Sequence, residues 1–355
     1  MSFTTNVRKL EFDYVRIEED EISNEQQLPC LKNLELSLQE TSPVLFTIFK
    51  KCEIKSLDIA LYGDAPYSDF IPLVELLSTQ NGLKLLKLKG FYETNLFMYD
   101  IKERVNFKLS SFSFSNGDLD EYIYLENFLL SQCSSLEELY VDKMPEVEYS
   151  AILNKCVNLR KLNIKPAGLN VNSLETIRIK ELILDAGESP NNLNEIVSKF
   201  PSVLTLCLKS CHDCTVLTTI SKTMLDLNSI SIDNGVVDNL ILKNIKKVLM
   251  RSVTTTSPAF TKFFIDNNTI EVLFLEVDGN FSDDMLEVIT KNLVELKILS
   301  IKNDCLLTKA AFEIIQSNCP KLKTFEMQYW NQKFNKDDMM ALFEMKGLSF
   351  YCKDC

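Results

Sequence analysis

One spacing of apolar residues returns along the whole chain, with apolar side chains at the first, fourth and sixth positions of a short segment. Leu322, Phe325 and Met327 form one copy. Fourteen copies begin at Val7, Leu31, Ile54, Leu83, Leu109, Leu136, Leu159, Ile179, Val203, Leu227, Ile245, Ile270, Leu296 and Leu322. Successive copies start about 18 to 29 residues apart, centred near 24, so the chain is an internal repeat array.

Each copy predicts a short strand. Its last two apolar residues are two positions apart and therefore share one face, while the first lies at the entrance to the strand. Stacked repeats would pair these strands in parallel and bury the apolar residues in one continuous core. The period lies in the leucine-rich-repeat range. We therefore predict an α/β leucine-rich-repeat solenoid, a curved horseshoe with a parallel sheet on the concave face and mostly helices on the convex face.

Between the strands, most repeats carry a helical pattern that begins at a capping residue, an acidic residue or an early proline. The expected helices follow Ser42-Pro43, Asp118 to Asp120, Ser257-Pro258, Ser282 and Thr308. Two connections, Val171 to Ile179 and Gly235 to Lys243, are short and aliphatic, and here we expect extended or tight-turn segments.

The chain contains no Pro/Gly/Ser-rich linker, which favours a single domain over 1–355 with about 14 repeats. The ends of a solenoid expose core, so we expect capping segments near 1–6 and 333–355. In the second, the sequence from Asn335 predicts a last helix followed by a strand.

Several repeats share a second signature, a cysteine three positions before the first apolar residue. It occurs at Cys133, Cys156 and Cys319, while Cys211 falls on a later Cys/Asn position. These repeats resemble the cysteine-containing class of leucine-rich repeats, which is similar to the arrays of F-box/leucine-rich-repeat proteins. That resemblance implies an adaptor that recognises substrates for a cullin-type ubiquitin ligase. The F-box, about forty residues before the repeats, has no equivalent here, since repeats begin near Val7.

Composition narrows the possible partners and compartments. The formal net charge of -12, with no Lys/Arg-rich run, disfavours nucleic acid. Eleven scattered cysteines fit buried apolar positions in a reducing compartment better than a disulfide framework. The chain has neither a signal-peptide pattern nor an apolar run long enough to span a bilayer, which predicts a cytoplasmic or nuclear protein without membrane contact. The sequons at Asn267 and Asn280 are therefore not expected to be glycosylated.

One cluster invites a chemical interpretation, from Cys207 through Cys211-His212-Asp213-Cys214. A closed zinc site needs four ligands, and the other Cys-x-x-Cys, Cys352 to Cys355, is over a hundred residues away. His212 is the only histidine and has no nucleophile motif around it. We therefore expect no metal, no cofactor and no enzyme activity. The terminal CKDC lacks the aliphatic residues of a prenylation signal.

The remaining candidate is a surface. Residues beside the strand leucines should line the concave sheet, and in the early repeats they are polar. In repeats eleven to thirteen the chain instead places an apolar patch there, bordered by charge and followed by two aromatic residues. The candidate partner-binding residues are Leu249, Arg251, Val272, Phe274, Glu276, Ile298, Lys302, Tyr329 and Trp330.

Such a patch is typical of a protein-binding hot spot, although register slippage or coverage by the C-terminal segment would also account for it. We expect a non-catalytic scaffold that binds a protein or peptide, as a monomer or within a hetero-complex. The resemblance to F-box/leucine-rich-repeat arrays implies a substrate-recognition subunit of an SCF-type ligase. The alternative is a leucine-rich-repeat activator of a small GTPase, which calls for repeats of about 28 residues.

Overall fold

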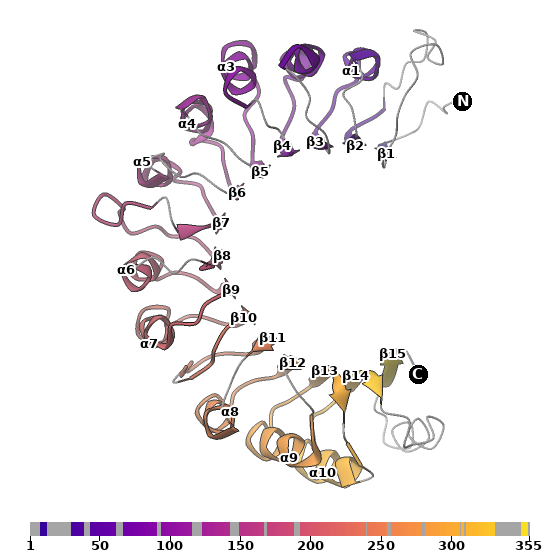
Figure 1. Cartoon of the computed structure of the whole chain (residues 1–355), viewed down its shortest axis with the longest axis vertical. Coiled ribbons are helices and arrows are strands. Elements are labelled where there is room, and N and C mark those ends of the chain that lie inside the picture. Colours follow the sequence, from indigo (N-terminus) through magenta and orange to yellow (C-terminus); the bar gives the residue numbers. More distant parts are fainter. Residues whose placement is uncertain are drawn as a thin grey trace. The chain divides into compact units, whose positions relative to one another are not determined.

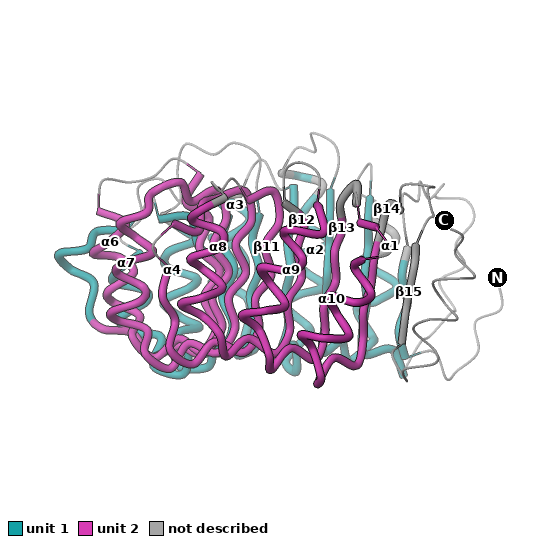
Figure 2. Tube along the Cα trace, turned by 90° about the horizontal axis from the view of Figure 1, so that it is seen from below, with its two compact units in different colours: residues 1–175 teal, residues 176–355 magenta. Residues whose placement is uncertain are grey.

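The computed structural model describes residues 8–12, 30–38, 43–61, 67–90, 94–115, 123–142, 149–166, 169–187, 192–238, 240–253, 257–277, 281–305, 307–308, 310–330 and 349–353. The chain forms two compact units, Met1–Glu175 and Thr176–Cys355 (Figure 2). In each unit, parallel strands follow one another in sequence order along the inner side of an arc, and helices lie on its outer side (Figure 1). The predicted α/β leucine-rich-repeat solenoid is confirmed.

The first unit contains seven described strands: β1 Lys9–Phe12, β2 Asn33–Leu38, β3 Ser56–Leu61, β4 Leu85–Lys89, β5 Ser111–Ser115, β6 Glu138–Val141 and β7 Lys161–Ile164. Its described helices are α1 Pro43–Phe49, the 3₁₀ turn η2 Tyr67–Phe70, α2 Ile71–Thr79, α3 Thr94–Arg104, α4 Ile123–Gln132 and α5 Tyr149–Lys155.

The second unit contains eight described strands: β8 Glu181–Asp185, β9 Thr205–Lys209, β10 Ser229–Asp233, β11 Lys247–Val253, β12 Val272–Val277, β13 Ile298–Cys305, β14 Thr324–Trp330 and β15 Ser349–Lys353. Its described helices are α6 Leu193–Ser198, α7 Cys214–Thr223, α8 Ser257–Asp266, α9 Asp283–Asn292 and α10 Ala310–Asn318.

The repeat pattern places the strands correctly. Each of the fourteen apolar triplets ends on one of the strands β1 to β14, and from Leu31 onward its residues are buried. Leu10 on β1 is only partly buried, since this first strand has a neighbour on one side alone within the described sheet. β15 pairs with β14 in parallel, which confirms the last predicted strand. The predicted cap near 1–6 lies outside the described residues, as does the predicted cap near 333–355 except for β15.

Helix starts also follow the sequence. The Ser282 hydroxyl accepts a hydrogen bond from the Met285 amide at 3.4 Å and caps α9. The Thr308 hydroxyl accepts one from the Ala310 amide at 3.2 Å, next to the start of α10. The two aliphatic connections, 171–179 and 235–243, contain turns and irregular backbone without a helix wherever they are described, as predicted.

Buried amide side chains join neighbouring repeats in the segments that precede the strands. The Gln80 carbonyl accepts from the Ile54 amide at 2.8 Å, and the Gln132 carbonyl accepts from the Leu109 amide at 3.0 Å. Asn267, only 1% exposed, accepts from Leu242 and donates to two carbonyls. These side chains supply hydrogen bonds to backbone groups that have left water, which would otherwise be costly. A glycan on Asn267 would break the set, whereas Asn280 lies outside the described residues.

Candidate functional site

The apolar patch predicted in the second unit is one continuous surface on adjacent strands. Strand register places Leu249 on β11 beside Phe274 on β12, and Val272 beside Ile298 on β13. All four side chains are partly exposed. The alternate residues of the same strands face the core and are fully buried, as the two-residue period of a strand requires. The predicted register is therefore correct over these three strands.

Charged residues border this patch along one row. Arg251 and Glu276 are register partners on β11 and β12, so opposite charges lie side by side. Arg251 is exposed, as is Lys302 on β13. The aromatic pair Tyr329 and Trp330 belongs to β14, but the side chains of both lie outside the described part of the structure.

Two residues beside the patch were missed by the sequence prediction. The Lys247 ammonium lies 5.7 Å from the ring centroid of Phe274, a cation–π contact that covers one side of the ring. Lys247 occupies a concave repeat position, so the positional rule that identifies the patch also identifies Lys247 once charged side chains are included. Ser300, the register partner of Phe274 on β13, is buried at 3% exposure.

The first unit provides the contrast. The polar residues predicted on its inner strands, Lys9, Glu11, Asn33, Glu35, Ser56, Asp58, Ser111, Ser113 and Ser115, are all partly or fully exposed. Several pair with one another: Lys9 lies 3.3 Å from Glu35, and Lys87 lies 3.0 Å from Asp58. Ion pairs thus join charged residues of that surface, whereas the patch on β11 to β13 leaves apolar area in contact with water.

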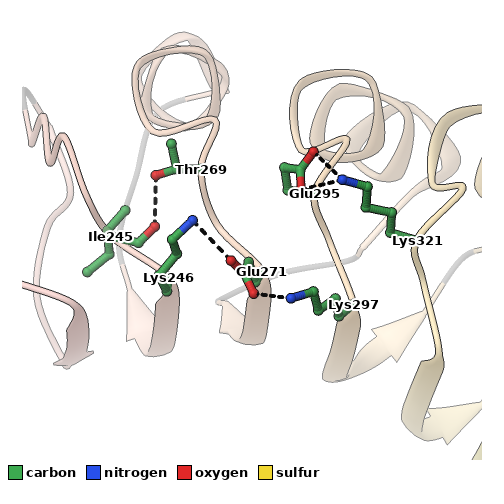
Figure 3. A network of polar contacts seen from close by, with 7 residues as sticks. All are labelled: Ile245, Lys246, Thr269, Glu271, Glu295, Lys297 and Lys321. Atoms are coloured by element: carbon green, nitrogen blue, oxygen red, sulfur yellow. Dashed lines mark hydrogen bonds and ion pairs between the residues drawn. The ribbon is translucent and has the colours of Figure 1, made fainter.

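An ion-pair network holds the strands of the patch in place (Figure 3). Lys246, Glu271 and Lys297 are the residues immediately before β11, β12 and β13. The Glu271 carboxylate bridges the two ammonium groups, 3.0 Å from Lys246 and in direct contact with Lys297. One repeat further on, Lys321 pairs with Glu295 at 2.7 Å. Each contact joins neighbouring repeats, so the ion pairs link the chain segments just before the strands that carry the patch residues.

This network makes stability depend on pH. Hydrogen bonds from Lys297 and then Lys246 lower the pKa of Glu271 from 4.5 to about 2. The ionised carboxylate is therefore favoured in the folded state, and its stabilising contribution is complete above about pH 4.5 and disappears as the pH falls towards 2. Glu271→Gln should lower the free energy of unfolding by about 1 kcal/mol at neutral pH, the scale of exposed ion pairs.

The measurement is chemical denaturation at pH 7, 4 and 2.5. The difference in the free energy of unfolding between Glu271→Gln and the unmodified chain should become smaller as the pH falls from 7 to 2.5. A constant difference would contradict the ionic origin. Glu287→Gln is a matched control, because within the described part of the chain that carboxylate pairs inside α9, with Lys291 at 2.8 Å.

Residues of the cysteine–histidine cluster pack in the core and cap a helix. Cys211 is buried at 1% exposure, which confirms its packing position. Asp213 caps α7 by accepting from the Thr215 amide at 2.8 Å. Burial raises the pKa of the thiols of Cys207, Cys211 and Cys214, which opposes thiolate formation. Among the residues that the structure describes, no group of three or more His, Cys, Asp or Glu side chains is arranged to hold a metal ion.

No helix in the described part of the chain is long and apolar enough to cross a membrane. No family model matches the sequence, and no curated protein matches it either. Similarity is found among solved structures. The chain resembles the crystal structure of the TLR13–ssRNA13 complex, with a TM-score of 0.52 and 14% identity, over 98% of this chain and 55% of the other. It thus spans about half the length of that relative.

Two further structures show weaker similarity. One is the Rad7–Elc1 complex in yeast, with a TM-score of 0.48 and 14% identity over 90% of this chain and 80% of the other. The second is the Drosophila Toll–Spatzle complex, with a TM-score of 0.42 and 11% identity over 94% and 51%. At 14% identity, the comparison with the TLR13–ssRNA13 complex shows the fold alone, the leucine-rich-repeat solenoid.

Proposed function

We propose that this chain is a non-catalytic interaction scaffold that binds a protein or peptide through the patch on β11, β12 and β13. The observation that carries the proposal is the register of Leu249 with Phe274 and of Val272 with Ile298. It joins four partly exposed apolar side chains on rigid strands. Such clusters stay in water at a cost unless a partner covers them.

The charged border suits recognition by a protein. Lys247, Arg251 and Lys302 are exposed cations around the apolar centre, and Glu276 lies beside Arg251. An apolar centre that excludes water and a charged rim that sets orientation are the two parts of a typical binding hot spot. The rigid sheet also avoids the ordering cost that a flexible loop would pay on binding.

The test replaces the centre of the patch. A tagged chain recovers partners from cell extract, and each is quantified by mass spectrometry with the unmodified chain and with Leu249→Asp/Phe274→Asp. Burying two carboxylates against an apolar partner surface should lower recovery of the partner at least about 100-fold. The matched control is Ser113→Asp, at the equivalent inner position of β5, which should leave recovery unchanged. Partner recovery that survives the double substitution would contradict the proposal.

The narrower version is a substrate-recognition subunit of an SCF-type ubiquitin ligase. Its support is the cysteine-containing repeat motif at Cys133, Cys156 and Cys319. This version predicts that a cullin–adaptor complex is recovered with the tagged chain and that its recovery does not depend on Phe274. Recovery of a patch-dependent partner without any cullin would remove the ligase role and keep the scaffold.

A further inference from the structure

Two buried thiols in the first unit lie against each other. Cys133 follows α4 and Cys156 follows α5, so they occupy the same position in successive repeats. Their sulfur atoms are 3.0 Å apart, about 1 Å longer than a disulfide bond. The Cys156 thiol donates to the Cys133 sulfur, and the Cys133 thiol is directed to the Ile152 carbonyl at 3.6 Å. The side chains are 4% and 3% exposed.

The contact between the two thiols shifts their pKa values in opposite directions. The hydrogen bond from Cys156 lowers the pKa of Cys133, and the positive charge of Lys155 acts in the same direction. The same bond raises the pKa of Cys156, with burial adding to it. Cys319 occupies the equivalent position near the other end of the chain, and there burial alone raises the pKa to about 12. Cys133 is thus the thiol of the pair that more readily becomes the nucleophilic thiolate.

We propose that Cys133 and Cys156 form an oxidisable dithiol that closes to a disulfide between two repeats when the chain meets a hydroperoxide. The Cys133 thiolate attacks one oxygen of hydrogen peroxide; the O–O bond breaks, and hydroxide leaves and is protonated to water. The product is a sulfenic acid on Cys133. The Cys156 sulfur then attacks the Cys133 sulfur, the S–O bond breaks, and the oxygen leaves as a second water with the Cys156 proton.

Overall, two thiols and one molecule of hydrogen peroxide are converted to one disulfide and two molecules of water. The thiols lose two electrons, and the peroxide gains them. Both sulfurs are buried, so the peroxide, little larger than water, enters during local opening of the repeat. The new bond joins the turns that follow α4 and α5. Because it restricts the unfolded chain across this segment, it should raise the melting temperature by about 3 °C or more.

The experiment treats the reduced full-length chain with hydrogen peroxide, alkylates the remaining thiols and maps tryptic peptides by mass. Cleavage after Lys143 and Lys155 leaves the two cysteines on separate peptides, each with a single cysteine. The expected product is one linked pair, two hydrogens lighter than the sum of its peptides, together with the higher melting temperature. The proposal is overturned if both cysteines are recovered alkylated, or if either is found linked to a different cysteine.

Single variants test the order of the steps. Cys156→Ala should halt the reaction at a sulfenic acid on Cys133, which dimedone traps, and Cys133→Ala should leave Cys156 largely unoxidised. Trapping on Cys156 in preference to Cys133 would overturn the assigned roles. Cys319→Ala is the matched control and should leave the yield of the linked peptide unchanged. The mapping of the unmodified chain needs no variant, so the disulfide remains testable if a substitution prevents folding.

Discussion

Replacement of Asn267 by alanine should lower the free energy of unfolding by about 3 kcal/mol. The Asn267 side chain accepts from the Leu242 amide at 2.6 Å and donates to the Leu240 and Phe263 carbonyls at 2.9 and 2.7 Å. Alanine would leave the Leu242 amide and the Leu240 carbonyl without this partner, whereas the Phe263 carbonyl would keep its hydrogen bond from the backbone amide of residue 267. Each unsatisfied buried group costs about 1–3 kcal/mol. Loss of side-chain volume in a packed interior adds to the effect.

Urea denaturation measures the loss, and hydrogen exchange at the Leu242 amide locates it. Exchange at that amide should accelerate more than at amides of β9, which lies outside this hydrogen-bond set. Asn244→Ala is the control, because Asn244 is exposed and makes one long hydrogen bond, 3.4 Å to the Leu225 carbonyl. It should change stability by less than about 0.5 kcal/mol. Equal losses in the two variants would mean that burial of the Asn267 amide contributes nothing.

The hydrogen bonds of Asn267 could not be predicted from the sequence. The strands were predictable because each repeat must bury the same three apolar positions, so an error in one copy is corrected by its neighbours. Asn267 belongs to no such pattern: in the sequence it is an ordinary polar residue of a possible glycosylation motif. Only the stacking of α8 beside the preceding irregular connection brings its amide to Leu240 and Leu242.

In the candidate site, too, the positions of residues were predictable and their side-chain contacts were not. Alternation along β11 to β13 was sufficient to assign Leu249, Val272, Phe274 and Ile298 to the surface, because a strand has only two faces. Contacts between side chains of neighbouring repeats were not predictable. The position of Lys247 over the Phe274 ring depends on rotamers, and the meeting of Cys133 with Cys156 depends on the lengths of two connections. The prediction of a single domain stays a prediction beside the two compact units.

Substitutions at two consecutive residues of β12 should separate folding from binding. Leu273 is fully buried, with Val248 and Leu299 as its register partners. Leu273→Ala leaves a cavity in this core and should lower the free energy of unfolding by about 3 kcal/mol, within the range of about 2–5 kcal/mol for such truncations. Phe274 faces the opposite side and is partly exposed, so Phe274→Ala should cost about 1 kcal/mol or less.

In partner recovery, the two variants should rank in the opposite order, with the larger loss for Phe274→Ala. At a temperature where both variants remain folded, Leu273→Ala keeps the surface of the patch, and recovery of the partner should stay near that of the unmodified chain. Phe274→Ala removes the largest apolar side chain of the patch, and recovery should fall at least about tenfold, the scale of a hot-spot truncation. Denaturant midpoints and quantitative recovery from extract measure the two effects. If Phe274→Ala destabilises the chain as much as Leu273→Ala does, then Phe274 belongs to the core and the binding surface lies elsewhere.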